Sequence, residues 1–185
     1  ILKKETGAPA AFGEKGFTTL ERMWARPTCD VNGLLSGYGG EGAKTIIPSR
    51  AMAKVSMRLV PDQDPGKIAK AFEKYVKEIA PSEVEVEVID HHGARPVLVP
   101  RKSPMMNAGM AALEKGFGAK PVFIREGGSI PIVGTFKECL KSPVLLLGYG
   151  LSTDNIHSPN EKFHLDNFWR GIRTSAILME EAAKQ

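Results

Sequence analysis

A strict alternation of glutamate and valine constrains the fold of this chain more than any other feature. Residues 83–89 read Glu-Val-Glu-Val-Glu-Val-Ile. Successive side chains of a strand point to opposite faces of a sheet, so a segment of this kind can bury only one of its two faces. The alternation therefore predicts a half-buried strand in a sheet with one covered and one polar face.

The region before this strand predicts the rest of the same sheet and a helix that covers it. Period-two patterns at 31–38 and 51–60 predict two further strands. Asp64 is a suitable N-cap and Pro65 a suitable first residue for a helix that ends before Pro81. The apolar stripe of this helix, expected to pack on the sheet, comprises Ile68, Phe72, Tyr75, Val76 and Ile79. Together these elements predict an α+β domain, with helices on an antiparallel sheet.

After Pro96 the pattern changes to apolar strands that alternate with helices. Helices are expected at 104–115, from Ser129, and at 166–183, and continuous apolar strands at 121–124 and 144–147. Strands of this kind are typical of an α/β layer covered on both faces. The stripe of the last helix comprises Trp169, Ile172, Ala176, Met179 and Ala183.

The first 25 residues predict a lead-in to the first domain. Residues 1–16 are rich in Gly, Ala and Lys and lack apolar periodicity, so they are expected to be irregular. A short helix is expected at 17–25. It should end before Arg26, because Pro27 disfavours a helical conformation at the residue before it. The start has neither an initiator Met nor the apolar core of a signal peptide, which suggests the middle of a longer chain.

Composition narrows the class of protein. With 42% hydrophobic and 25% charged residues, the 185-residue chain has the balance of a soluble globular protein, and no apolar run is long enough for a membrane span. The net charge of +4 comes from dispersed lysines, which argues against a nucleic-acid partner. Cys29 and Cys139 lie far apart without metal-finger spacing, so a reducing cytoplasm is expected.

The segment Arg125–Pro131 has the features of a carboxylate-binding turn. It follows a predicted strand and opens a predicted helix, with Ser129 at the N-cap position. Glycines, among them Gly128, let a ligand approach the backbone. Free amides at a helix start attract an anion, which Arg125 can also bind through two parallel hydrogen bonds. The alternative is an ordinary strand-to-helix turn with an exposed arginine.

A second candidate site follows the apolar strand 144–147, at the edge where open α/β sheets bind ligands. His157 in this loop can ligate zinc through a neutral imidazole, with Asp154 or Glu161 as support. One histidine does not make a metal site, because catalytic zinc needs about three protein ligands. An ordinary loop histidine is therefore the alternative.

Other candidates lie near the expected junction of the two domains and on the first sheet. His91 and His92 follow the Glu/Val strand, and because adjacent strand residues face opposite ways, at most one enters a cleft. Arg58 lies on the polar face of its strand, and Thr45 lies just before an apolar pair. By residue type alone, both are ordinary surface residues.

Taken in order, these segments resemble a known enzyme family. They are Gly42–Pro48 (GAKTIIP), Arg58–Pro61 (RLVP), His92–Pro96 (HGARP), Arg125–Pro131 (REGGSIP) and His157–Glu161 (HSPNE). The chain is similar to the carnosinase and cytosolic non-specific dipeptidase branch of the zinc aminoacylase and carboxypeptidase G family. The resemblance runs from about residue 26 to the C-terminus.

The resemblance implies a ferredoxin-like α+β lid at 26–92, incomplete here, joined to part of an α/β zinc-peptidase domain at 93–185. Lid sheets of the family commonly pair into a homodimer. His157 matches a zinc ligand, with zinc, manganese or cobalt as the metal and two ions per complete subunit. The residues that match substrate-binding positions, with Thr45 reaching into the partner subunit, are Arg125, Gly128, Ser129, His92, Arg58 and Thr45.

The chain also departs from the family pattern. The other metal ligands of the family, among them those of a His-x-Asp motif, and its glutamate general base come from an N-terminal half. The resemblance therefore implies a parent enzyme that hydrolyses dipeptides or N-acyl amino acids, and an isolated chain that is inactive. The alternative is a natural truncated module that dimerises or binds small anions without catalysis.

Overall fold

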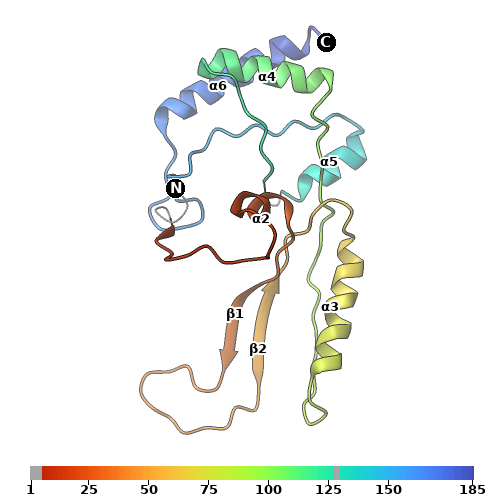
Figure 1. The fold of residues 1–185 in the computed structure, drawn as a ribbon, viewed down its shortest axis with the longest axis vertical. Helices are drawn as coiled ribbons and strands as arrows, with labels where there is room; N and C mark the ends of the chain where they lie inside the picture. Colours follow the sequence, from red (N-terminus) through yellow and green to blue (C-terminus); the bar gives the residue numbers. More distant parts are fainter. Residues whose placement is uncertain (1–5, 127–129) are drawn as a thin grey trace. The chain divides into compact units, whose positions relative to one another are not determined.

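The computed structural model describes residues 6–126 and 130–185 and divides into two compact units (Figure 1). The first unit comprises Ile1–Pro96 and Ile124–Pro131, and the second Val97–Phe123 and Ile132–Gln185. The change of organisation near Pro96 thus coincides with a change of unit. The assignment of 26–92 to a lid and 93–185 to a catalytic part stays a prediction.

Helix α2, Thr19–Ala25, confirms the short helix expected after the irregular lead-in. The hydroxyl of Thr18 accepts a hydrogen bond from the backbone N–H of Glu21, and the Glu21 carboxylate accepts one from the N–H of Thr18. This reciprocal capping satisfies amides that a helix start otherwise leaves without partners. The helix ends at Arg26, before Pro27, as predicted.

The sheet contains β1, Asp30–Ser36, and β2, Ala51–Ser56, paired antiparallel with a bulge between Val31 and Gly33. Both strands were expected, but each ends earlier than its sequence pattern. The predicted third strand at 83–89 is wrong as an element: the segment is not hydrogen-bonded into a sheet. Alternation shows which face of a strand can be buried, but a strand also needs a neighbouring backbone about 4.8 Å away.

Helix α3, Pro65–Ile79, begins as the sequence predicts. The Asp64 carboxylate accepts a hydrogen bond from the N–H of Lys67 at 3.0 Å, and Pro65 occupies the first turn. The chain then returns beside the helix to its start, where Arg95 pairs with Asp64 at 2.7 Å and Gly93 lies against Pro65 (Figure 1). The return segment therefore contacts the N-terminal end of α3.

The expected packing of α3 on the sheet is not found. Among the described residues, helix α4 contacts helix α6 and strand β1 contacts strand β2, and α3 contacts neither strand. Tyr75 and Ile79, two members of the predicted stripe, are 59% and 61% exposed. The two described strands cannot supply the broad apolar face that such a stripe requires.

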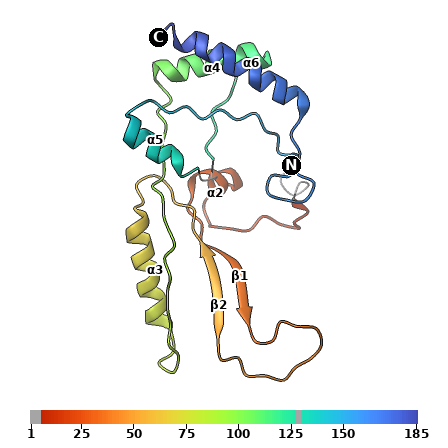
Figure 2. The same cartoon turned by 180° about the vertical axis from the view of Figure 1, so that it is seen from behind.

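The second unit is built around α4, Pro104–Phe117, and α6, Leu165–Ala182, which lie side by side (Figures 1 and 2). Small residues allow this close contact. Ala108 and Ala112 of α4 are buried, and a Cβ atom at Gly116 would overlap the Thr174 hydroxyl of α6. The third helix of this unit, α5, spans Ile132–Leu140 and starts later than the expected start at Ser129. Ser129, the predicted N-cap, lies outside the described residues.

The two strands predicted after Pro96 are wrong. The segments 121–124 and 144–147 are not strands of a sheet, because, like 83–89, they have no hydrogen-bonded neighbouring strand among the described residues. The apolar stripe predicted for α6 is largely open among the described residues, and its members Trp169, Ile172 and Met179 are 64%, 52% and 75% exposed. Helix α6 instead presents Thr174, which lies against Gly116 of α4.

Few apolar side chains are fully buried. Ala108, Ala112 and Val133 form the buried apolar set among the described residues, and the accessible surface is 15191 Å². A compact monomer of this mass exposes about 8,700 Å². Large apolar faces are therefore open to contact with other protein. No described helix is both long and apolar enough to cross a membrane.

Candidate functional site

The loop 148–162, which carries His157, is fixed to the helical pair at its start. The ring of Tyr149 stacks on Phe117 of α4, with ring centres 5.7 Å apart, and lies against Gly171 of α6. Asn167 donates a hydrogen bond from Nδ2 to the carbonyl oxygen of Tyr149 at 2.9 Å. A Cβ atom at Gly171 would lie 3.0 Å from the Tyr149 ring, closer than an ordinary van der Waals contact, so the glycine favours this close approach.

Asp154 holds the interior of the same loop. Its side chain is 2% exposed, and its Oδ2 accepts a hydrogen bond from the N–H of Leu151 at 2.7 Å. The N–H of Lys162 donates to the Asp154 carbonyl oxygen at 2.9 Å, and the Lys162 ammonium lies 3.6 Å from Oδ1. The carboxylate thus supports the loop backbone.

His157 is exposed and has a φ of 62°, a left-handed conformation that is uncommon for a residue with a side chain. Asn155 and Asn160 also have positive φ, and the Ser158 hydroxyl donates to the Asn155 carbonyl oxygen. The structure therefore places the imidazole on a tight turn open to ligands. Glu161, the other proposed support, is exposed.

The described residues do not by themselves form a metal site. In ranges 6–126 and 130–185, no three His, Cys, Asp or Glu side chains are grouped so that they could hold an ion. His157 fits the role of a single imidazole ligand, but the other ligands of a zinc site would have to come from elsewhere. No step of a reaction can be derived from a metal bound by this chain alone.

Arg125 and Arg58, two of the predicted carboxylate-binding residues, lie in the first unit. Arg125 is exposed, and Gly128 and Ser129 lie outside the described residues. The backbones of Arg58 and Thr28 are hydrogen-bonded, with the Thr28 N–H donating to the Arg58 carbonyl oxygen at 3.1 Å. The roles predicted for Arg125, Gly128, Ser129 and Arg58 stay predictions.

The structure also locates the remaining candidates. Thr45 is exposed in the connection between β1 and β2. His92 is exposed in the segment that returns to the start of α3, next to Gly93. The sequence interpretation missed Tyr149 and Lys162 as supports of the histidine loop. Tyr149 stands between two glycines, the one local signal that could have identified it.

The chain belongs to peptidase family M20/M25/M40, whose family model matches residues 37–181. Among its relatives is the Cys-Gly metallodipeptidase dug1 of Schizosaccharomyces pombe, 33% identical over 98% of this chain and 39% of the relative. The human Beta-Ala-His dipeptidase is 29% identical over 89% of this chain and 33% of the relative. These findings confirm the resemblance inferred from the sequence.

Solved structures of the family have the same fold over the whole chain. The di-peptidase Dug1p of Saccharomyces cerevisiae superposes with a TM-score of 0.82 at 31% identity, over 100% of this chain and 39% of that chain. The M20 metallo-carboxypeptidase Sso-CP2 of Sulfolobus solfataricus gives 0.84 at 30% identity, with 42% of its chain covered. The present chain thus spans about two fifths of the length of the first relatives it matches.

Proposed function

We propose that this chain is the substrate-recognition portion of a metal-dependent dipeptidase and that it contributes one metal ligand. The observation that carries the proposal is membership of the peptidase family together with relatives named as metallodipeptidases. The parent enzyme hydrolyses the peptide bond of dipeptides or N-acyl amino acids. On its own the chain is inactive, since one imidazole cannot hold the metal ions.

The chemistry assigned to the chain is recognition of the free carboxylate of the substrate. Arg125 donates two parallel hydrogen bonds to that carboxylate, an arrangement that fits guanidinium geometry. Gly128 and Ser129 complete the binding turn, and Arg58, His92 and Thr45 line the substrate pocket, Thr45 from the partner subunit. His157 supplies one imidazole ligand to one of the two metal ions of the complete subunit. These ions are zinc, or else manganese or cobalt, and the chemistry that they would supply is activation of water.

The proposal extends to the whole protein. Residues 26–92 act as a lid whose sheet, including β1 and β2, pairs in a homodimer, and residues 93–185 form part of an α/β catalytic domain. The enzyme works in the cytoplasm, in accord with its free cysteines, Cys29 and Cys139.

The role of Arg125 can be tested in the whole protein. Arg125→Ala removes a charged hydrogen bond and should lower kcat/KM for a dipeptide at least about tenfold. Arg125→Lys keeps the charge without the paired geometry and should recover part of the loss. Arg173→Ala, which removes an exposed arginine of α6, is the control and should leave the rate unchanged. A normal rate for Arg125→Ala would exclude the assigned role.

A further inference from the structure

The loop that carries His157 contains a buried carboxylate with an incomplete set of partners. Asp154 is 2% exposed, and its Oδ1 accepts no hydrogen bond from the residues that the structure describes, while Oδ2 accepts one from Leu151. A buried charge is tolerated only where partners compensate the lost hydration. The main compensating charge is the Lys162 ammonium, 3.6 Å from Oδ1. Replacing Asp154 therefore removes a group on which several contacts depend.

These contacts close the loop upon itself. The Asp154 carboxylate holds the amide of Leu151, and the Asp154 carbonyl oxygen accepts the amide of Lys162. Asp154 thereby links Leu151, three residues before it, to Lys162, eight residues after it. His157 lies inside the segment from Asp154 to Lys162 that these contacts close. The Asp154 carboxylate makes the contact to the Leu151 amide and the ion pair with Lys162, so the support of this segment by residue 154 depends in part on its side chain.

The backbone of the closed segment requires such support. His157 has a φ of 62°, and Asn155 and Asn160 have φ values of 55° and 60°. A left-handed conformation costs a residue with a side chain about 1–2 kcal/mol, and it persists where surrounding contacts over-determine it. With Tyr149 fixed between α4 and α6, the loop is held at its start and in its interior. The arrangement orients the imidazole before any metal arrives.

We infer that Asp154 is a positioning residue that fixes the loop 151–162 in the conformation in which His157 can ligate a metal ion. The inference rests on the proposed function, in which His157 is a metal ligand. It assigns to Asp154 support of the loop backbone, which differs from a direct contact to the imidazole. Loss of Asp154 should weaken metal binding because the unliganded loop then samples conformations that turn His157 away.

The test uses the whole protein and Zn²⁺ alone, with affinity measured by competition against a chromophoric chelator. Asp154→Ala should weaken Zn²⁺ binding at least about tenfold, within the range for groups that support metal ligands. It should also speed hydrogen exchange at the amides of Leu151 and Lys162 in the metal-free protein. Asp154→Asn keeps an oxygen that accepts from Leu151 and should recover most of the affinity, which also covers the case that Asp154→Ala fails to fold.

Two further variants separate the possible failures. Glu181→Gln removes another largely buried carboxylate of the same unit, away from the loop, and should leave Zn²⁺ affinity unchanged even if it lowers the melting temperature. If it weakens binding as much as Asp154→Ala, the effect is general destabilisation and the inference fails. If His157→Ala weakens binding but both Asp154 variants keep the normal affinity, the inference alone is overturned. If His157→Ala has no effect, the proposed function of His157 fails and the inference fails with it.

Discussion

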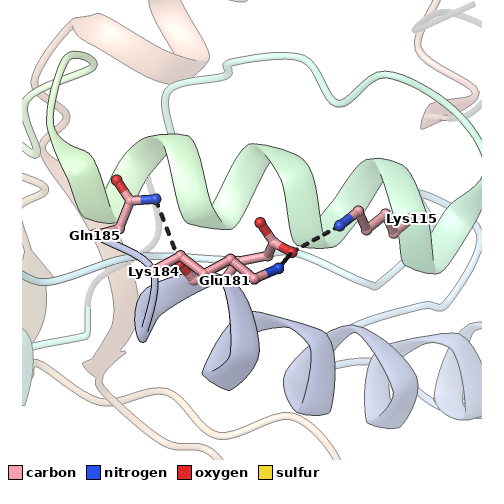
Figure 3. A network of polar contacts seen from close by, with 4 residues as sticks. All are labelled: Lys115, Glu181, Lys184 and Gln185. Atoms are coloured by element: carbon pink, nitrogen blue, oxygen red, sulfur yellow. Dashed lines mark hydrogen bonds and ion pairs between the residues drawn. The ribbon is translucent and has the colours of Figure 1, made fainter.

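Glu181 joins α6 to α4 at the C-terminal end of the chain. Its Oε1 accepts hydrogen bonds from the ammonium groups of Lys115, at 2.7 Å, and Lys184, at 2.6 Å (Figure 3). The hydrogen bond from Lys115, followed by that from Lys184, lowers the pKa of Glu181 from its usual 4.5 to about 2. The side chain of Gln185 donates to the Glu181 carbonyl oxygen, so the same residue also anchors the end of the chain.

The lowered pKa of Glu181 predicts a specific acid sensitivity. A carboxyl whose pKa is lower in the folded state stabilises the fold above its unfolded pKa, and this stabilisation is lost as the pH falls from about 4.5 towards 2. Glu181→Gln lacks this contribution. The difference in melting temperature between the original protein and Glu181→Gln should therefore be full at pH 7 and shrink below about pH 4.5.

Thermal unfolding of both proteins between pH 7 and pH 3 measures this difference. Glu114→Gln, at an exposed position of α4, is the matched control and should show little difference at any pH. A difference for Glu181→Gln that stays constant over the whole range would contradict the ion pairs as the source of the shift.

The sequence indicated a candidate residue in the loop and left the residue that supports it open. It singled out His157 and left Asp154 and Glu161 as alternatives, because both are carboxylates at short separation. The structure distinguishes them by burial, with Asp154 enclosed and Glu161 exposed. Burial depends on contacts between distant segments, such as Tyr149 with α4, and no local pattern records those contacts.

Helices were predicted more accurately than strands, for a physical reason. Helix α3 begins at Pro65 with Asp64 as its cap, and α4 begins at Pro104 with Ser103 as its cap, because helix signals and hydrogen bonds are local. The segments 83–89, 121–124 and 144–147 have strand patterns but no described partner strand. Strand formation depends on a second segment, so a pattern in one segment cannot establish it.

The contact between α4 and α6 predicts which glycine tolerates a side chain. A Cβ at Gly116 would overlap the Thr174 hydroxyl, which already donates a hydrogen bond to the Arg170 carbonyl oxygen. Gly116→Ala should therefore lower the free energy of unfolding by about 1–3 kcal/mol, as overpacking usually does. Chemical denaturation of the whole protein measures the change.

Gly66→Ala is the control for this effect. Gly66 lies in the first turn of α3, where an added Cβ would meet only the Asp64 carboxylate at an ordinary 3.4 Å. Alanine favours the helix more than glycine by about 1 kcal/mol, so this variant should be neutral or slightly more stable. Equal losses for the two variants would show that Gly116 is not a close-contact position.

At the scale of the whole molecule, the exposed apolar surface is the main feature. The stripe of α6, with Trp169, Ile172 and Met179, and the outer residues Tyr75 and Ile79 of α3 are open in the described structure. The chain spans about two fifths of the length of relatives whose fold it shares. We expect these faces to be covered in the whole protein, as the sequence patterns of both helices indicate. The covering surface is not among the described residues, so the burial of both faces stays a prediction.

The proposed metal-dependent dipeptidase activity is tested most simply by measuring hydrolysis with the whole protein. The substrates are a dipeptide with a free carboxylate and its C-terminal amide, each with and without a chelator. We predict that the free dipeptide is hydrolysed, and that the chelator abolishes activity and added Zn²⁺ restores it. The amide should react at least about tenfold more slowly, because it lacks the charged hydrogen bond to Arg125. Equal rates for the dipeptide and its amide, or activity that survives removal of metal, would contradict a metal-dependent dipeptidase that recognises its substrate by the carboxylate.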